Sequence, residues 1–584
     1  MATNRNGLHA VLRRVAAIAP PLIVWMALSG GDVGFSPDSI FYWSAARTIY
    51  REHVLATGVS VADYDRTLGS VAPVLRRGTT APSGALVYPL TTWPPGYPLA
   101  LAAVMTVTRS ATAAARLLCA ATLILTLVLL SALASQLVGP ERGALAASLV
   151  GLLPALQDST RMAWSDGLFL VFALTTVLLL ARWLDEPEVR ATLPLWASAA
   201  AVAGTYTRYV GCTLYLLLIV ALAVHGAWRG RLRGRKIWAP FGLALLLYPL
   251  LVSVLLIRNL RTASEIGGTR STSYPGLSNT AFQMVRALVE GFIPIGNHLP
   301  PGPHDTLVTG AVSLTVWSIG LAAVTWVVVR SRRADAQGGP SRSQFPEWRK
   351  GSASLVLVFA IVYCGVLYLL RPVWRFGIDS RMLLPAAVCV ALLGVTRLTL
   401  CLPNRRLFSI GAVWVFVTAL ATFVSLSVVD QVREDWRIFT GRPLLSRPIV
   451  PWIKRAIGTN RDGAPRVLTA GYLIAYLHFV TDGHPTVGLP ALGDLATVLP
   501  DSATGATLIV TVPFGQGSSF PCAEYQRVYE TLLTAVADSV SQGDGYTGWW
   551  LSPRRGRQAR LADGAGRVRV AELCVNQSAE TRGT

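Results

Sequence analysis

Residues 11–47 read VLRRVAAIAPPLIVWMALSGGDVGFSPDSIFYWSAAR, a long apolar stretch followed closely by an acidic residue in a second, shorter segment. Ser36 and Pro37 predict a helix start there, because serine is a favoured N-cap and proline a favoured first helical residue. The helix would lie along the membrane interface. Asp38 would then stand where a membrane helix leaves the bilayer, and catalysis and capping of the helix dipole both explain an acid at that position. Three aromatic residues would occupy the headgroup layer: Phe41, Tyr42 and Trp43.

The composition indicates a polytopic membrane protein. Of the 584 residues 52% are hydrophobic and 14% are charged, whereas about a quarter of a soluble protein is charged. The net charge of +21 does not indicate nucleic-acid binding, because the basic residues lie in loops between apolar segments. The run RGRLRGRK at 229–236 contains no acid. Such loops are typical of the cytoplasmic side.

The sequence predicts eleven to thirteen membrane helices. An odd number would place the N-terminus and the basic loops in the cytoplasm, and the loops 30–95 and 258–305 and the region after 428 outside. The first span is interpreted as a retained anchor, and 194–226 is long enough for one broken helix or two. The candidate spans are 11–29, 96–108, 112–137, 142–157, 163–183, 194–226, 237–257, 306–330, 352–371, 382–400 and 407–427.

Residues 430–584 differ from the membrane body at 1–429. Short apolar runs at 466–470 and 507–512 predict strands, and 525–540 predicts an amphipathic helix. The expected architecture is therefore an α-helical polytopic body with a small extracytoplasmic α/β domain. Outside the cytoplasm, Cys522 and Cys574 could form a disulfide.

The order of these features resembles the GT-C superfamily of membrane glycosyltransferases. A first span leads into the helix that carries Asp38, and the first loop ends in WPPGYPL at 93–99. Ser165-Asp166 opens a span, Arg258-Asn259 closes one, and DSRMLLP at 379–385 enters another. Within the superfamily the chain is most similar to the group that uses polyprenyl-phosphate sugars, including protein mannosyltransferases and aminoarabinose transferases. It departs from the protein mannosyltransferases at Ser39, where they carry a second acid, and this leaves the acceptor open.

The resemblance implies transfer of a sugar from a polyprenyl-phosphate donor to a cell-envelope glycan, lipid or protein on the outer face. Asp38 would act as the general base that deprotonates the acceptor hydroxyl. A single displacement would invert the anomeric centre. The sequence shows no reliable set of metal ligands, and a divalent cation would fit only if Asp38 and another carboxylate converge.

Cationic side chains near the outer interface are expected to stabilise the leaving phosphate. Each has a structural alternative: Arg381 could anchor a span by snorkelling, Arg258 could favour a helix C-terminus, and Arg208 could mark a turn between helices. Arg375 stands between aromatic residues and is explained best by interfacial anchoring. The candidates, in order of preference, are Arg381, Arg258, Arg208 and Arg375.

Five further residues complete the predicted site. Asp379 could orient an arginine, and Asn259 stands beside Arg258. Asp166 is either a second carboxylate near the catalytic site or an acid in the first turn of a helix capped by Ser165. Trp93 and Tyr97 could shape the sugar pocket, although a rigid turn with interfacial aromatics explains them better.

Other function classes remain open. A polyprenyl-lipid glycan ligase would share the outer-face geometry. A transporter or flippase of lipid-linked sugars would place ionisable groups near the bilayer midplane, often in repeated halves, and the chain shows no such repeat. A membrane scaffold would use Asp38 only as a cap.

Overall fold

The structure is a computed structural model of the whole chain. It describes residues 2–29, 33–34, 37–59, 78–84, 86–185, 191–229, 235–263, 276–292, 350–374, 378–400, 407–435, 466–469, 486–488, 507–511, 523–543, 546–552, 555 and 558. The chain divides into two compact units. The first comprises 1–34 and 91–436, and the second comprises 35–90 and 437–584.

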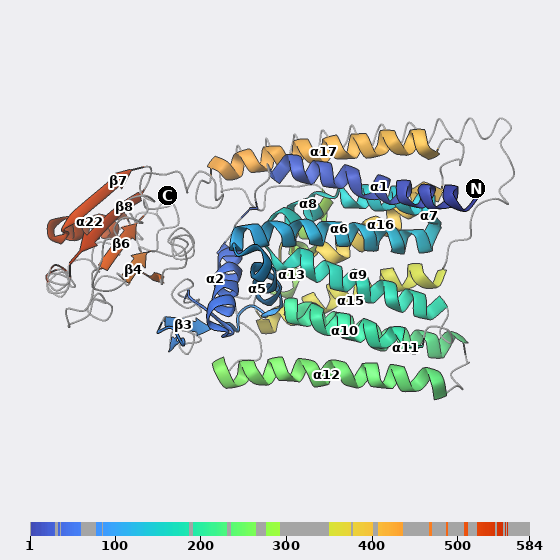
Figure 1. The fold of residues 1–584 in the computed structure, drawn as a ribbon, viewed down its shortest axis with the longest axis horizontal. Helices are drawn as coiled ribbons and strands as arrows, with labels where there is room; N and C mark the ends of the chain where they lie inside the picture. Colours follow the sequence, from blue (N-terminus) through green and yellow to red (C-terminus); the bar gives the residue numbers. More distant parts are fainter. Residues whose placement is uncertain are drawn as a thin grey trace. The chain divides into compact units, whose positions relative to one another are not determined.

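The first unit is a helical bundle (Figure 1). Its described elements are α1 (Ala2–Ser29), α5 (Gly96–Thr108), α6 (Ala111–Val138), α7 (Pro140–Gly151), α8 (Pro154–Arg161), α9 (Ser165–Asp185), α10 (Leu193–Thr207), the 3-10 turn η2 (Tyr209–Gly211), α11 (Cys212–Arg229), α12 (Arg235–Ala263), α13 (Leu277–Phe292), α15 (Lys350–Trp374), α16 (Leu384–Leu400) and α17 (Leu407–Asp435).

Local sequence explains where the early helices begin and end. α5 ends at Arg109, which adopts a left-handed conformation and donates its N–H to the carbonyl of Met105. The hydroxyl of Ser110 then caps α6 by accepting the N–H of Ala113 at 3.3 Å. α6 ends at Gly139, whose φ of 85° favours glycine. α7 follows with Pro140 in its first turn.

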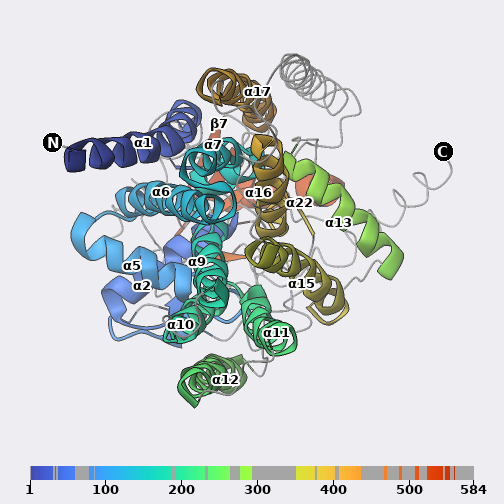
Figure 2. The same ribbon diagram turned by 90° about the vertical axis from the view of Figure 1, so that its right-hand side faces the viewer.

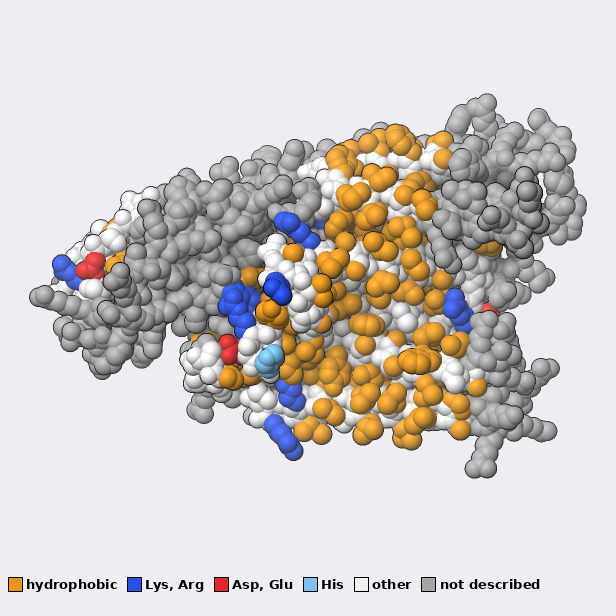
Figure 3. All heavy atoms as spheres, in the orientation of Figure 1, with side chains coloured by type: hydrophobic (Ala, Val, Ile, Leu, Met, Phe, Trp, Pro, Cys, Tyr) orange, Lys and Arg blue, Asp and Glu red, His pale blue; other side chains and the backbone are white. Residues whose placement is uncertain are grey.

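Hydrophobic surface surrounds this unit. Exposed apolar side chains of α12 include Leu243, Leu246, Leu250 and Val254, and Figure 3 shows the wide apolar area over the helical body. Among the described residues, five helical stretches are long and apolar enough to cross a membrane: 111–138, 165–185, 239–263, 351–372 and 410–427. The protein is therefore a multi-pass membrane protein.

α9 forms the centre of the bundle. It packs against α10, α6, α15 and α11, and the end-on view shows it surrounded by other helices, with α12 at the periphery (Figure 2). Its last turn contributes Trp183, which is fully buried and lies 5.1 Å from the ring of Phe241.

Two predicted segments differ from the observed helices. The predicted span 142–157 is two helices, α7 and α8, because the chain breaks before Pro154 and proline disfavours a helical residue ahead of it. The stretch 194–226, predicted as one broken helix or two, divides at Arg208 into α10 and α11. The predicted outer loop 258–305 begins inside α12 and contains the amphipathic helix α13, which was not predicted from the sequence. The candidate span 306–330 lies outside the described residues.

The second unit contains α2 (Pro37–Glu52) and a three-stranded antiparallel sheet of order β1-β3-β2, formed by Ala56–Thr57, Leu86–Pro89 and Thr79–Thr80. Ser44 links α2 to the chain that follows, because its Oγ accepts hydrogen bonds from the Thr57 hydroxyl at 3.0 Å and the Gly58 N–H at 2.9 Å.

The C-terminal part contains a five-stranded sheet of order β5-β4-β6-β8-β7. β4 is parallel to β5 and β6, whereas β8 runs antiparallel to its neighbours. The predicted strands and the α/β character are confirmed, but the helix ends at Val536 and Val540 lies in a strand. The elements are β4 (Arg466–Thr469), β5 (Thr486–Gly488), β6 (Thr507–Thr511), α22 (Ala523–Val536), β7 (Ser539–Gly543) and β8 (Tyr546–Leu551).

Candidate active site

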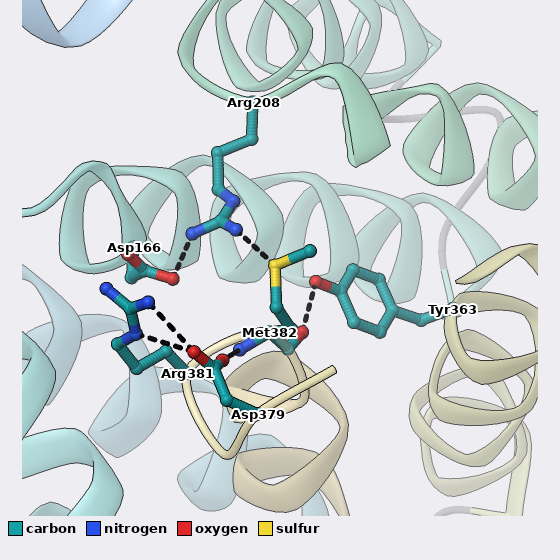
Figure 4. Close-up of polar contacts among 6 residues, drawn as sticks. All are labelled: Asp166, Arg208, Tyr363, Asp379, Arg381 and Met382. Carbon is teal, nitrogen blue, oxygen red and sulfur yellow. Dashed lines mark hydrogen bonds and ion pairs between the residues drawn. The ribbon is translucent and has the colours of Figure 1, made fainter. Parts of the chain in front are cut away.

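Asp166 and Arg208 form an ion pair at one end of the bundle. Asp166 lies in the first turn of α9, and Arg208 is the extended residue that ends α10. Arg208 Nη1 donates to Asp166 Oδ1 (Figure 4), and the side chains of Arg208 and Asp166 are 16% and 6% exposed, respectively. The break between α10 and α11 therefore places the Arg208 guanidinium at the start of α9. Arg208 is both the turn marker and the buried charge that the sequence suggested.

Asp379 and Arg381 form a second pair just before α16. Asp379 Oδ2 accepts hydrogen bonds from Arg381 Nε at 2.9 Å and Nη2 at 2.8 Å. Its other oxygen accepts the backbone N–H of Met382 at 2.9 Å. The predicted role of Asp379 in orienting an arginine matches this geometry, and Arg381 is the arginine concerned. Both side chains remain about a fifth exposed, at 22% and 23%.

Met382 joins the two ion pairs. Its sulfur accepts a hydrogen bond from Arg208 Nη2, and its carbonyl accepts the hydroxyl of Tyr363 at 2.7 Å (Figure 4). Four charged groups from three separate segments thus converge in one place, with two positive and two negative charges. In a membrane body such a cluster indicates a functional site, because buried ionisable groups are costly there.

A chain of hydrogen bonds extends the site toward α12. The Tyr209 hydroxyl donates to the carbonyl of Thr91 at 2.6 Å and accepts from Asn259 Nδ2 at 2.7 Å. Arg258 Nη1 donates to Asn259 Oδ1 at 3.1 Å. Arg258 and Asn259 are therefore connected by hydrogen bonds to Tyr209, the residue that follows Arg208 in the chain. Arg258 itself is half-buried.

The segment from Trp93 to Tyr97 packs tightly beside Arg208. Both aromatic side chains are buried, at 4% and 1% exposure. A Cβ on Gly96 would lie 2.5 Å from the carbonyl oxygen of Tyr206, so only glycine allows this approach of α5 to the end of α10. The predicted rigid turn thus supports the position of Arg208.

Asp38 lies in the first turn of α2 and is half-buried. It belongs to the second compact unit. The expectation that Phe41, Tyr42 and Trp43 face the headgroup layer is wrong, because all three are buried in the protein, with at most 5% exposed. Four residues before Asp38, Gly34 pairs with the chain between α8 and α9 in the first unit.

Several sequence candidates lie outside the described residues: Arg375, Cys522 and Cys574. Among the residues that the structure describes, no group of three His, Cys, Asp or Glu side chains comes together to hold a metal ion.

Sequence reasoning missed Tyr209, Tyr363 and Met382. Tyr209 and Met382 directly follow Arg208 and Arg381 in the sequence, and this adjacency was the available signal, because residues next to a helix break are brought to the same end of the bundle. Tyr363 had no such signal, since it lies within α15 on an apolar face.

Comparisons with known proteins agree with this fold. Residues 92–255 match the family described as dolichyl-phosphate-mannose-protein mannosyltransferase. The structure of ArnT from Cupriavidus metallidurans bound to undecaprenyl phosphate is similar, with a TM-score of 0.57, 13% identity, and coverage of 92% of this chain and 97% of that chain. The apo structure of the same protein is also similar, with a TM-score of 0.57 and 14% identity. That match covers 93% of this chain and 98% of that chain. A comparison with curated protein sequences finds no match.

These matches confirm the resemblance at the level of the fold. The family match covers α5 to α11 and the larger part of α12, and this part of the chain contributes Asp166 and Arg208. The structural match extends over nearly the whole of both chains. The protein has the GT-C fold and is similar to the membrane proteins of the protein mannosyltransferase and ArnT type.

Proposed function

We propose that the protein is a membrane glycosyltransferase that takes a sugar from a polyprenyl-phosphate donor. The observation that carries the proposal is the convergence of the Asp166–Arg208 and Asp379–Arg381 pairs at one end of a bundle of ArnT-like fold. Guanidinium groups recognise phosphate oxygens through paired N–H donors. ArnT from Cupriavidus metallidurans binds undecaprenyl phosphate, which supports a lipid phosphate as the anion bound here.

The two arginines would stabilise the departing lipid phosphate as negative charge develops on it. Arg381 is more accessible to a lipid phosphate than Arg208, because its side chain is 23% exposed and that of Arg208 is 16% exposed. Asp166 and Asp379 hold these cations in fixed orientations. A cation held in advance requires less reorganisation when the substrate binds.

Asp38 is proposed as the general base. The acceptor hydroxyl attacks the anomeric carbon, its proton passes to the Asp38 carboxylate, and the bond from that carbon to the phosphate oxygen breaks with its electron pair on phosphate. One displacement of this kind inverts the anomeric centre. The support is the place of Asp38 in the first turn of α2, four residues after the Gly34–Met162 backbone pairing.

The site is proposed to face the outside of the cell membrane. The basic run at 229–236 begins at Arg229, the last residue of α11, whereas Arg208 lies near the N-terminal end of that helix. Because basic loops favour the cytoplasm, the ion-pair end would be extracytoplasmic. The acceptor is then a cell-envelope glycan, lipid or protein, and the C-terminal domain lies on the same side.

The test uses protein reconstituted in lipid with a panel of radiolabelled polyprenyl-phosphate sugars and a cell-envelope acceptor fraction. Native protein should transfer sugar from one donor, and Asp38→Asn should reduce transfer at least about a hundredfold, because loss of a general base costs roughly 10²–10⁴ in rate. Glu52→Gln is the matched control, since Glu52 ends the same helix and binds the Ser83 N–H at 3.1 Å.

A well-inserted Asp38→Asn protein that transfers sugar at the native rate would refute the role of Asp38. Movement of intact donor across the bilayer without sugar transfer would instead indicate a flippase, and transfer only of preassembled glycans would indicate a ligase.

A further inference from the structure

The indole of Trp164 lies against the guanidinium of Arg381. The Arg381 Cζ is 4.2 Å from the centre of the ring, which is within the range of a cation–π contact. Trp164 is only 5% exposed, so the ring face that meets Arg381 is shielded from water. Shielding strengthens this contact, because its attraction is electrostatic.

The backbone around Trp164 is held from two sides. The N–H of Gly34 donates to the carbonyl of Arg161 at 3.0 Å, and the N–H of Ala163 donates to the carbonyl of Gly34 at 3.0 Å. The thiol of Cys119 donates to the carbonyl of Met162 at 3.3 Å. The chain after α1 and the helix α6 thus fix the connection between α8 and α9, and with it the start of the Trp164 side chain.

Asp379 and Trp164 constrain Arg381 in different ways. The Asp379 carboxylate accepts hydrogen bonds from Nε and Nη2, which lie on one edge of the guanidinium. A carboxylate on one edge leaves the plane free to rotate about the hydrogen bonds. An aromatic face packed against the guanidinium removes that freedom.

We propose that Trp164 is a positioning residue, which holds the plane of the Arg381 guanidinium in the orientation that binds the phosphate of a lipid-linked donor. The inference rests on the proposed function and deepens it, since it assigns the residue that prepares the phosphate contact. An aliphatic side chain of similar bulk would fill the space but would not attract the cation.

The experiment measures binding of polyprenyl phosphate to purified protein in detergent. It compares the native protein with Trp164→Leu, Trp164→Phe, Arg381→Gln and the double variant Trp164→Leu/Arg381→Gln. Trp183→Leu is the matched control for losing a buried indole, because Trp183 is fully buried and packs on Phe241, at the end of α9 opposite Asp166.

Trp164→Leu should raise the Kd roughly 2- to 30-fold, the range that corresponds to a cation–π contact. Trp164→Phe should recover part of the loss, because it restores an aromatic face. In the Arg381→Gln background, Trp164→Leu should have no further effect, since Trp164 acts through Arg381. Trp183→Leu should bind as the native protein does.

Native affinity in Trp164→Leu would overturn the inference. So would an equal loss in Trp164→Leu with and without Arg381→Gln, because additivity would mean that the ring does not act through the arginine. In both cases the native protein still binds the lipid, and the proposed function stands. A native protein with no affinity for polyprenyl phosphate would refute both.

Discussion

The two ends of α9 carry aspartates in contrasting surroundings. Asp166, in the first turn, pairs with Arg208, whereas Asp185, the last residue, accepts a hydrogen bond from Gln136 Nε2 at 2.7 Å. The helix has 21 residues, so about 30 Å separate the two ends. The same amino acid on one helix thus takes part in a charged cluster at one end and in an amide contact at the other.

The backbone differs in the same way. At the Asp166 end, the chain leaves regular helix before α9, at Arg208, and in the segment before α16. At the Asp185 end, Gln136 lies in the last turn of α6 and also reaches Ser352 Oγ, at 3.2 Å, in the first turn of α15. Interrupted helices and buried charges both reduce stability, and their coincidence at one end supports the proposal that substrate binds there.

The largest expected effect comes from removing the cation at the charged end. Arg208→Gln leaves the carboxylate of Asp166 in place without its ion-pair partner Arg208. Unfolding free energy should fall by about 3–5 kcal/mol, because breaking a buried ion pair removes a compensating charge from the remaining carboxylate. Sugar transfer should fall by about 10²–10³ as a charge-stabilising donor is lost. Thermal unfolding in detergent and donor turnover measure the two quantities.

The double variant Asp166→Asn/Arg208→Gln separates stability from function. Removing both charges should recover most of the lost stability, while transfer stays low because no guanidinium remains at that position. Recovery of transfer together with stability would show that Arg208 acts only as a structural partner of Asp166.

The sequence predicted the membrane body and several site residues for identifiable reasons. α5 was predicted with its observed bounds, since Pro95 and Gly96 mark its start and Arg109 its end. Arg208 stood out as a charge inside an apolar stretch, and Asp166, Asp379 and Arg381 stood out as charges at the entry of membrane spans. Arg208 and Asp166 are 42 positions apart, however, and no local pattern shows which charges meet. Long-range pairing depends on how helices pack, which periodicity alone does not determine.

The same limit explains the errors. Phe41, Tyr42 and Trp43 were placed in the headgroup layer because aromatic residues favour it, yet tertiary packing buries all three. The break between α7 and α8 was missed because hydropathy continues through Leu152 and Leu153, and only Pro154 marks it. α13 was missed because its apolar residues recur on one face and never form a continuous run.

A smaller effect is expected from Gly96→Ala, which tests whether the close contact of α5 with α10 supports the charged end. The added Cβ would meet the carbonyl of Tyr206 at 2.5 Å. Overpacking of this kind costs about 1–3 kcal/mol, and transfer should also fall because Arg208 lies two residues beyond the contact. Thermal unfolding and donor turnover, each compared with the native protein, measure these effects.

Gly394→Ala is the control for Gly96→Ala, since a Cβ at Gly394 in α16 meets nothing within 4 Å. It should leave stability equal or raise it by up to about 1 kcal/mol, because alanine favours helix over glycine. Equal behaviour of the two alanine variants would show that the contact at Gly96 is unimportant.

The smallest effect should come from Gln136→Leu, at the other end of α9. Leucine removes the hydrogen bonds to Asp185 and Ser352, and each bond of this kind contributes about 1 kcal/mol to stability. Unfolding free energy should therefore fall by about 1–2 kcal/mol, while transfer per folded molecule stays at the native value. A loss of transfer as large as that of Arg208→Gln, at intact folding, would mean that the two ends are coupled. The contrast between a charged binding end and a structural end would then be wrong, because both ends would serve the reaction.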